Sequence, residues 1–267
     1  MISALKRHWP EYLMEAWGLG MFMVAAGLVG TVIFYPQSPV HQALPNPFVQ
    51  RVMMGLGMGL TAMAIMYSPW GKRSGAHINP AVTLTFYRLQ KIGPWDAFFY
   101  IVFQFLGGLL GVLLVALLLR APFIQAPVNY VVTVPGPAGN VAAFWGEFTI
   151  AVIMMGTVLY SSNQPHLAHL TPFFAGCLIV SYVVFESPLS GFGMNPARTV
   201  ASALPSGIWT AIWLYFVAPI SGMLTAAEIY LRLFGPHKIF CAKLYHDPAH
   251  QCIHCGHRIY WHRPHPR

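Results

Sequence analysis

The chain alternates between long apolar stretches and short polar segments that are rich in proline and glycine. Six of the apolar stretches reach or approach the roughly 20 residues that a helix needs to cross a hydrocarbon core of about 30 Å. They cover residues 12–34, 48–68, 96–119, 142–160, 170–186 and 208–234. The pattern therefore predicts an all-α integral membrane protein with six transmembrane helices.

The composition agrees with this prediction. Of the 267 residues, 56% are hydrophobic and only 8% are charged, whereas roughly a quarter of the residues of a soluble domain are charged. The first apolar stretch follows Lys6 and Arg7, as the core of a signal peptide would, but it is longer than the roughly 7–15 residues of such a core and contains Glu15. We therefore expect it to be retained as a helix.

The net charge of +8 is distributed unevenly between the two sides of the membrane. With the N-terminus inside, the exterior segments hold only Arg51, Arg120 and Arg198, and the remaining basic residues are interior. The interior set is Lys6, Arg7, Lys72, Arg73, Arg88, Lys91, Arg232 and a basic tail. This positive-inside bias predicts that both termini are cytoplasmic, in a plasma membrane or a bacterial inner membrane. The basic excess then serves topology and anionic lipid headgroups, and no nucleic-acid partner is expected.

The tripeptide Asn-Pro-Ala occurs twice, in "SGAHINPAVTLTFYRL" (74–89) and in "SGFGMNPARTVASALPSG" (190–207). Each copy follows the second apolar stretch of a half whose first stretch contains a glutamate, Glu15 or Glu147. Because each half holds three stretches, an odd number, the second half begins on the opposite face. Such inverted repeats are typical of transport proteins with a site near the membrane midplane.

The repeat predicts four parts of the chain. Residues 1–119 form the first repeat, residues 120–141 an exterior connecting loop, residues 142–235 the second repeat and residues 236–267 a cytoplasmic tail.

Each Asn-Pro-Ala predicts the start of a short helix. Asparagine is a preferred N-cap, and proline is favoured at the first helical position. The motif residues are Asn79, Pro80 and Ala81 in the first copy and Asn195, Pro196 and Ala197 in the second. Helices of about ten residues span about 15 Å, half of the hydrocarbon core, so two re-entrant half-helices would meet at its centre. Their positive dipole ends would repel cations and protons there, and we expect each asparagine NH₂ group to be free to donate into a lumen.

With these features the chain resembles the aquaporins and glycerol facilitators, the major intrinsic protein family, over residues of about 10–235. The matching pieces are Glu15, Glu147, "SGAHINPAVT", Gln104 with Gly107 and Gly108 in "QFLGG", "GMNPAR", and "APISG" (218–222). The resemblance implies an aquaporin-like fold with one pore per subunit, a homotetramer, and no required cofactor. It also implies that Glu15 and Glu147 support the half-helix loops by accepting backbone N–H bonds.

In this family four residues line the narrowest point of the pore, on its exterior side. The arginine after the second Asn-Pro-Ala is Arg198, and an arginine in an apolar wall is a functional candidate. It would reject cations and donate hydrogen bonds to neutral hydroxyls. Three residues before Asn195, the matching residue is Phe192, in a signature similar to that of glycerol facilitators.

The other two filter positions are carried over by alignment with the family. The fifth helix contributes Val183, with Tyr182 as the alternative one residue away, and the second helix contributes Gly59, or Gly57 if that helix carries an insertion. The glycines at 55–59, 107, 108, 111 and 222 also predict close helix packing. His77 is expected to pack in or line the inner vestibule.

A ring of Gly, Val, Phe and Arg is wider and less polar than a strict water filter, although Thr199, Ala203 and Tyr215-Phe216 are similar to the residues of water channels. The sequence thus predicts a passive channel that passes water and small neutral solutes, such as glycerol, urea or a metalloid hydroxide, and excludes ions and protons. A strict water channel and a non-conducting structural protein of the same fold are the alternatives. An enzyme is not expected, because the seven acidic residues form no paired carboxylates.

The tail, residues 236–267, holds seven of the 12 histidines and three of the four cysteines. Cys252 and Cys255 have a chelating spacing. The candidate metal ligands are Cys241, His250, Cys252, Cys255 and His257, with His246 and His254 as further candidates. Because the cytosol keeps thiols reduced, a metal such as zinc is favoured over a disulfide. The alternative is a basic tail on anionic headgroups whose charge rises below about pH 6.5.

Overall fold

The structure is a computed structural model that describes residues 1–246 and 252–256, and within these residues all regular secondary structure is helical. The helices are α1 (Ile2–Phe34), α2 (Pro39–Ala43), α3 (Pro47–Tyr67), α4 (Pro69–Ser74), α5 (Pro80–Arg88), α6 (Pro94–Leu119), α7 (Ala121–Ile124), α8 (Gly139–Ser162), α9 (Thr171–Phe185), α10 (Ser187–Ser190), α11 (Pro196–Ser206) and α12 (Leu214–Phe234). Short 3₁₀ turns lie at Asn129–Val131, Ala168–Leu170 and Pro236–Lys238. Proline opens α2, α3, α4, α5, α6 and α11, because its fixed φ suits the first helical position.

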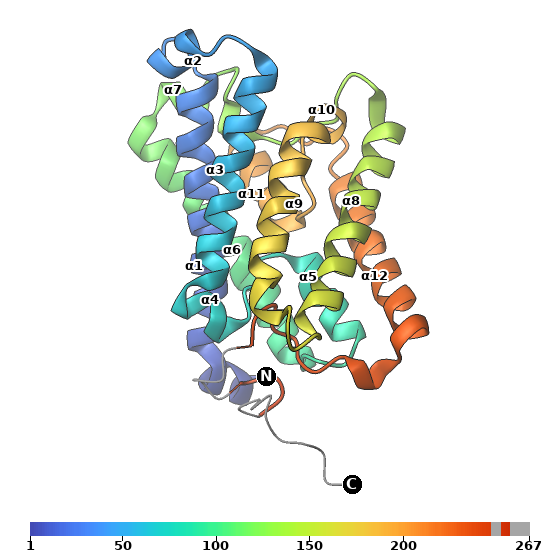
Figure 1. Ribbon diagram of the computed structural model, residues 1–267. Helices are drawn as coiled ribbons and strands as arrows, with labels where there is room; N and C mark the ends of the chain where they lie inside the picture. The colour runs from blue at the N-terminus through green and yellow to red at the C-terminus, as the bar shows by residue number, and fades with distance from the viewer. Residues whose placement is uncertain (247–251, 257–267) are drawn as a thin grey trace, which may run out of the picture.

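Six of these helices, α1, α3, α6, α8, α9 and α12, are long and apolar enough to cross a membrane. They stand side by side as one bundle (Figure 1). The predicted all-α membrane fold with six spans is therefore confirmed. The helix α1 begins at Ile2 rather than at residue 12, because its polar first turns are helical without being apolar.

Glycines bring the spanning helices into close contact. The most extensive helix pairs are α1 with α6, α8 with α12, and α3 with α9. In the first pair, Gly107 of α6 lies directly against the backbone of Ala16 in α1. In the third pair, a Cβ atom at Gly55 would lie 2.9 Å from the carbonyl oxygen of Val180. Small residues drive helix association in lipid, where the hydrophobic effect between helices is absent, so the predicted packing role of the glycines is confirmed.

The helices α5 and α11 are the two half-helices, of 9 and 11 residues. We call the face at which α1 begins and α12 ends the N-terminal face. The helix α5 lies toward this face and α11 toward the opposite face (Figure 1). The two half-helices contact each other inside the bundle. The segment between α6 and α8 contains α7 and a 3₁₀ turn, and its Phe123 and Val128 are buried.

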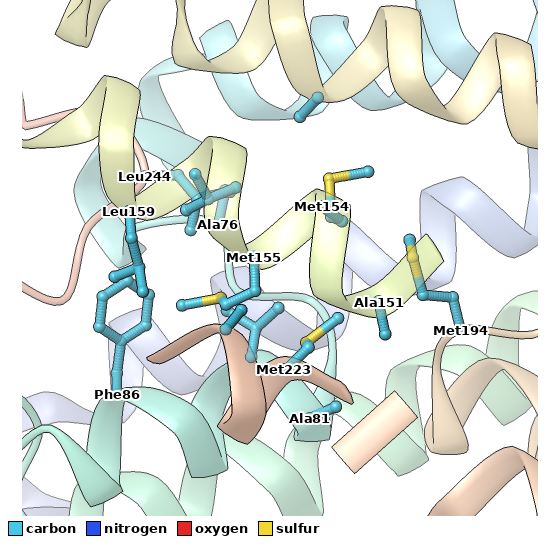
Figure 2. Packing of buried hydrophobic residues seen from close by; sticks show 14 of the residues in the cluster. Ala76, Ala81, Phe86, Ala151, Met154, Met155, Leu159, Met194, Met223 and Leu244 are labelled. Carbon is cyan, nitrogen blue, oxygen red and sulfur yellow. The ribbon is translucent and has the colours of Figure 1, made fainter. Parts of the chain in front are cut away.

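Both halves share one buried cluster around the start of α5. Met154 of α8, Met223 of α12 and Met194 of the second loop belong to the same cluster as Ala81 (Figure 2). Leu244, which follows α12, belongs to the same cluster. The centre of the bundle is thus built from both repeats and from the segment after the last span.

Candidate pore and tail cluster

The two Asn-Pro-Ala asparagines cap the half-helices. The Asn79 Oδ1 atom accepts a hydrogen bond from the backbone N–H of Ala81, at 2.9 Å. The Asn195 Oδ1 atom accepts from the backbone N–H groups of Ala197 and Arg198, at 3.0 and 3.2 Å. Each proline follows at the first helical position. These contacts satisfy N–H groups that a helix N-terminus would otherwise leave without partners.

The asparagine NH₂ groups also join the two halves. The Asn79 Nδ2 atom donates to the carbonyl oxygen of Met194, at 2.9 Å, and the Asn195 Nδ2 atom donates to the carbonyl oxygen of Ile78, at 2.7 Å. The sequence predicts that these NH₂ groups are free to donate into a lumen, and this expectation is wrong for one hydrogen of each, which binds the opposite loop because the loops meet at the centre. Both asparagines nevertheless line the cavity described below.

The loop before each half-helix has an unusual backbone. Positive φ angles occur at Ala76 (53°) and Ile78 (40°) in the first loop and at Phe192 (56°) and Met194 (49°) in the second. Positive φ is costly for residues with a Cβ atom. Alternation of this kind turns successive N–H groups toward one point, where they can bind an anion.

Buried glutamates occupy these two points. Glu15 accepts hydrogen bonds from the backbone N–H groups of His77 (3.1 Å) and Ile78 (2.6 Å). It also accepts from the Ser74 hydroxyl (2.7 Å) and from the Gln104 Nε2 atom (2.8 Å). A carboxylate that accepts several hydrogen bonds stabilises a strained loop, because charge-assisted bonds are the strongest of their kind.

The second loop repeats this arrangement. Glu147 accepts hydrogen bonds from the backbone N–H groups of Gly193 (2.6 Å) and Met194 (2.5 Å) and from the Ser190 hydroxyl (2.6 Å). The Tyr215 hydroxyl donates to the Ser190 carbonyl oxygen at 2.5 Å. In the first loop, Tyr100 donates in the same way to Ser74, at 2.7 Å.

A cavity of about 320 Å³ lies between the two repeats. Asn79 and Asn195 both line it, together with Val183, Phe192 and Arg198. Toward the N-terminal face its lining includes Met66, His77 and Leu244, and toward the opposite face Phe34, Arg51 and Val132. The cavity thus extends along the bundle past the meeting point of the half-helices.

Three of the four predicted filter residues lie on the cavity wall: Val183, Phe192 and Arg198. The alternative to Val183, Tyr182, instead contacts the Phe192 ring, with 6.1 Å between the ring centroids. The Nη1 atom of Arg198 is buried and has no hydrogen-bond partner within the described part of the chain. Other atoms of Arg198 line the cavity, so the residue contributes to its wall.

The fourth predicted filter residue, Gly59, lies on a different face of α3. A Cβ atom at this position would lie 2.7 Å from the carbonyl oxygen of Gly176 and 2.5 Å from the Val180 Cγ2 atom, both in α9. The alternative, Gly57, faces Val29 of α1. Both glycines therefore serve helix packing.

The cavity wall of α3 is formed by other residues that the sequence reasoning missed. Met54, Met58, Ala62 and Met66 line the cavity. They recur every four residues, a spacing that places side chains on one helix face and could have identified the wall.

Beyond α12, four side chains converge into a cluster that could hold a metal ion. The ligand atoms of Cys241, His246, Cys252 and Cys255 all lie within 4.8 Å of one another. The Cys241 and Cys252 Sγ atoms are 3.4 Å apart, and the His246 Nε2 atom lies 3.3 Å from the Cys255 Sγ atom. Three predicted ligands belong to this cluster, and His246 is the fourth member. Of the remaining candidates, His250 and His257 lie outside the described residues, and the His254 ring stacks on the His77 ring instead of joining the cluster.

Within this tail cluster, the surroundings favour the thiolate form that metals bind at Cys252. Hydrogen bonds with Cys241 and Cys255 hold the pKa of the Cys252 thiol well below its usual range, whereas the hydrogen bonds with Cys252 and Cys255 raise the pKa of the Cys241 thiol. The Lys243 side chain is only 2% exposed and adds a positive charge beside the sulfur atoms. All four cysteines of the chain lie among the described residues, and no disulfide joins them.

Comparison with known proteins places these features in a family. The sequence profile of the Major intrinsic protein family matches residues 3–230. Aquaporin NIP2-3 of Zea mays is 32% identical over 187 residues, which cover 69% of this chain and 60% of that protein. Aquaporin NIP1-3 of Oryza sativa subsp. japonica is 34% identical over 174 residues, 64% of this chain and 58% of that protein. The chain thus spans about three-fifths of the length of these relatives.

A solved structure shares the fold. The X-ray structure of the aquaglyceroporin from Plasmodium falciparum superposes with a TM-score of 0.72 at 22% identity, over 86% of this chain and 98% of that one. The profile match across most of the chain agrees with the six spanning helices and the two capped half-helices of the structure. The chain therefore belongs to the major intrinsic protein family, whose members are membrane channels rather than enzymes.

Proposed function

We propose that the protein is a passive channel for water and small neutral solutes. The cavity between the two repeats carries this proposal, because its lining combines both capping asparagines with Arg198. The amide groups of the two asparagines and the guanidinium group of Arg198 are the donors in this lining from which a passing hydroxyl would accept hydrogen bonds. The kinship with proteins named aquaporin and the fold of an aquaglyceroporin support the same function.

Exclusion of ions and protons follows from the electrostatics of the centre. Each half-helix N-terminus carries roughly half a positive charge, and the two ends meet at Asn79 and Asn195. Arg198 adds a full positive charge on the way to the opposite face. A water molecule that accepts hydrogen bonds from these donors is poorly oriented to relay a proton along a file.

The apolar character of the wall favours solutes larger than water. Val183 and Phe192 offer no hydrogen bonds, and the contribution of α3 is a row of methionines around Met58. Methionine side chains are flexible and adapt to ligands of different shape. We therefore assign glycerol, urea or a metalloid hydroxide to the channel in addition to water.

Light scattering of proteoliposomes after osmotic shock tests this assignment. The permeability of zinc-free proteoliposomes to water, glycerol, urea and boric acid is compared with that of empty vesicles of the same lipid. Permeation by water and at least one solute supports the proposal. Permeation by water alone indicates a strict water channel, and permeability equal to that of empty vesicles indicates a non-conducting member of the fold.

The orientation and assembly belong to the same proposal. The N-terminal face carries Lys6, Arg7, Lys72 and Arg73, and such a basic excess favours the cytoplasmic side of a plasma membrane or bacterial inner membrane. A homotetramer with one pore per subunit is expected from the family. Native mass spectrometry from detergent checks the assembly, and protease access in sealed vesicles checks the orientation.

The tail cluster is assigned to zinc. Zinc prefers tetrahedral sites of cysteine and histidine with Zn–S distances of about 2.3 Å, which place the ligand atoms about 3.8 Å from one another. The distances of 3.3, 3.4 and at most 4.8 Å in the cluster are close to this value. Lys243 would offset the single negative charge that three thiolates and one Zn²⁺ leave.

A further inference from the structure

The segment between α12 and the end of the described tail covers the cavity at the N-terminal face. Residues 241–246 form no helix or strand, yet Ala242, Lys243 and Leu244 are at most 5% exposed. Irregular backbone normally lies on the surface, because its polar groups need water. Burial of this segment therefore requires specific partners.

Those partners stand on two sides of the cavity. On one side, the Phe240 N–H group donates to the Asn163 side chain at the end of α8, at 2.8 Å. On the other side, the Leu244 N–H group donates to the Gly75 carbonyl oxygen at 3.2 Å. The Lys243 ammonium group donates to the Lys72 carbonyl oxygen at 3.1 Å. The segment therefore spans from α8 to the loop that precedes α5.

Leu244 closes the end of the cavity from this position. It lies in the cavity lining together with His77, and Figure 2 shows it beside Ala76, the residue after its hydrogen-bond partner Gly75. His77 itself is only 2% exposed, and its Nε2 atom is hydrogen-bonded to the Ala242 carbonyl oxygen. A mouth open to water would leave this histidine solvated.

The tail cluster holds the covering segment in place. Cys241 and His246 lie at its two ends, and Cys252 and Cys255 join them from a later part of the chain. His254 lies between the last two cysteines in the sequence. Its ring stacks on the His77 ring, with 6.0 Å between the centroids and 9° between the ring planes, and its centroid lies 5.6 Å from that of the Tyr100 ring. The candidate metal site is therefore in contact with the loop of the first Asn-Pro-Ala motif.

We propose that zinc bound by Cys241, His246, Cys252 and Cys255 holds residues 241–246 across the N-terminal mouth of the pore, so that metal occupancy restricts permeation. The proposal rests on the channel function proposed above. With the metal bound, the four ligands close a loop around Leu244, and the mouth is covered. Without it, no bond to a shared ion joins residues 241 and 246 to the later cysteines, and the loop regains its conformational freedom, because metal binding supplies the folding free energy of such small sites.

Two measurements on the purified full-length protein test the proposal. Zinc per chain is measured by mass spectrometry of the metal, in reducing buffer. Water permeability is measured in proteoliposomes before and after treatment with a membrane-permeant zinc chelator, and again after zinc is restored. We expect one zinc per chain, a several-fold rise in water permeability on zinc removal, and a return to the first value on restoration.

Variants separate metal binding from closure. The double variant Cys252→Ser, Cys255→Ser is expected to lose zinc and to be permanently permeable. Leu244→Ala is expected to keep zinc but to be as permeable as the chelated protein. Cys177→Ser, an exposed cysteine of α9 far from the cluster in sequence, is the matched control and should behave as the unaltered chain.

The outcomes are distinguishable. If the purified protein contains no zinc after dialysis against a zinc-containing buffer, the metal site is overturned. A second outcome is one zinc per chain together with equal water permeability in the zinc-bound, the chelated and the Leu244→Ala protein, all above that of empty vesicles. This outcome overturns the closure but supports the channel. Permeability equal to that of empty vesicles in every preparation overturns the channel and the closure together, while the zinc measurement still tests the site.

Discussion

Asn79 and Asn195 each bind the loop of the other: the Asn79 Nδ2 atom lies 2.9 Å from the Met194 carbonyl oxygen, and the Asn195 Nδ2 atom lies 2.7 Å from the Ile78 carbonyl oxygen. Each side-chain oxygen meanwhile caps its own half-helix. Each asparagine amide thus caps a half-helix, joins the two repeats and lines the cavity. The junction is symmetric because the two halves enter the membrane from opposite faces.

This dual role predicts that Asn79→Ala is more destabilising than the loss of an ordinary cap. The variant loses a cap of about 1 kcal/mol and a buried hydrogen bond of about 1 kcal/mol. Asn46→Ala is the control, because Asn46 caps α3 through the N–H groups of Phe48 and Val49 and, among the described residues, its side chain forms no hydrogen bond with the other repeat. Thermal unfolding in detergent should show the larger drop in melting temperature for Asn79→Ala. Equal drops would contradict the role of the cross-link.

Glu147→Gln is predicted to destabilise the second loop strongly. It replaces a carboxylate that accepts three hydrogen bonds, and each such bond to a charged group contributes about 1.5–3 kcal/mol. Glu228→Gln is the control, because Glu228 forms an exposed ion pair with Arg88 at 2.7 Å, which contributes at most about 1 kcal/mol. Yield of folded protein and melting temperature measure the difference. A smaller effect for Glu147→Gln than for Glu228→Gln would refute the account of the loop.

Gly59→Ala is predicted to disrupt the contact between α3 and α9. The added methyl group would meet Gly176 and Val180 at 2.7 and 2.5 Å, and overpacking of this kind costs about 1–3 kcal/mol. Gly156→Ala in α8 is the matched control, since no heavy atom lies within 4 Å of its Cβ position. That change should be neutral or stabilising by about 0.5–1 kcal/mol. If Gly59→Ala left stability unchanged and altered solute selection only, Gly59 would belong to the filter after all.

Arg198→Val is predicted to admit protons or small cations. It removes the positive charge that directly follows the second Asn-Pro-Ala motif, whereas Arg51→Val removes a second charge of the cavity lining, toward the opposite face, whose Nε atom donates to the Val184 carbonyl oxygen at 3.2 Å. Decay of a pH gradient, followed with a dye trapped in zinc-free proteoliposomes, measures the leak. We expect faster decay for Arg198→Val than for Arg51→Val. Equal rates in both variants and in the unaltered chain would show that exclusion does not depend on Arg198.

Much of the fold could be predicted from the sequence because it rests on local chemistry. Apolar length predicts the six spans, and the capping preference of Asn followed by Pro predicts where α5 and α11 begin. The odd number of spans in each half predicts the inversion. Each of these inferences follows from the order of residues along the chain and needs no knowledge of how the helices pack.

The remaining features depend on how helices rotate and meet. A step of one residue turns a side chain by about 100° around the helix, which is why Gly59 faces α9 while Met58 faces the cavity. Similarly, spacing suggested several histidines as ligands, and only the folded tail brings His246 to the three cysteines. The position of Leu244 at the cavity end has no local signal.

The most direct test of the central claim is the osmotic response of zinc-free proteoliposomes, compared with empty vesicles of the same lipid and size. A channel through the cavity between Asn79, Asn195 and Arg198 predicts faster water efflux and, under an inward gradient of glycerol or urea, faster re-swelling than in empty vesicles. Water and solute rates equal to those of empty vesicles, from protein shown to be folded and inserted, would contradict the account.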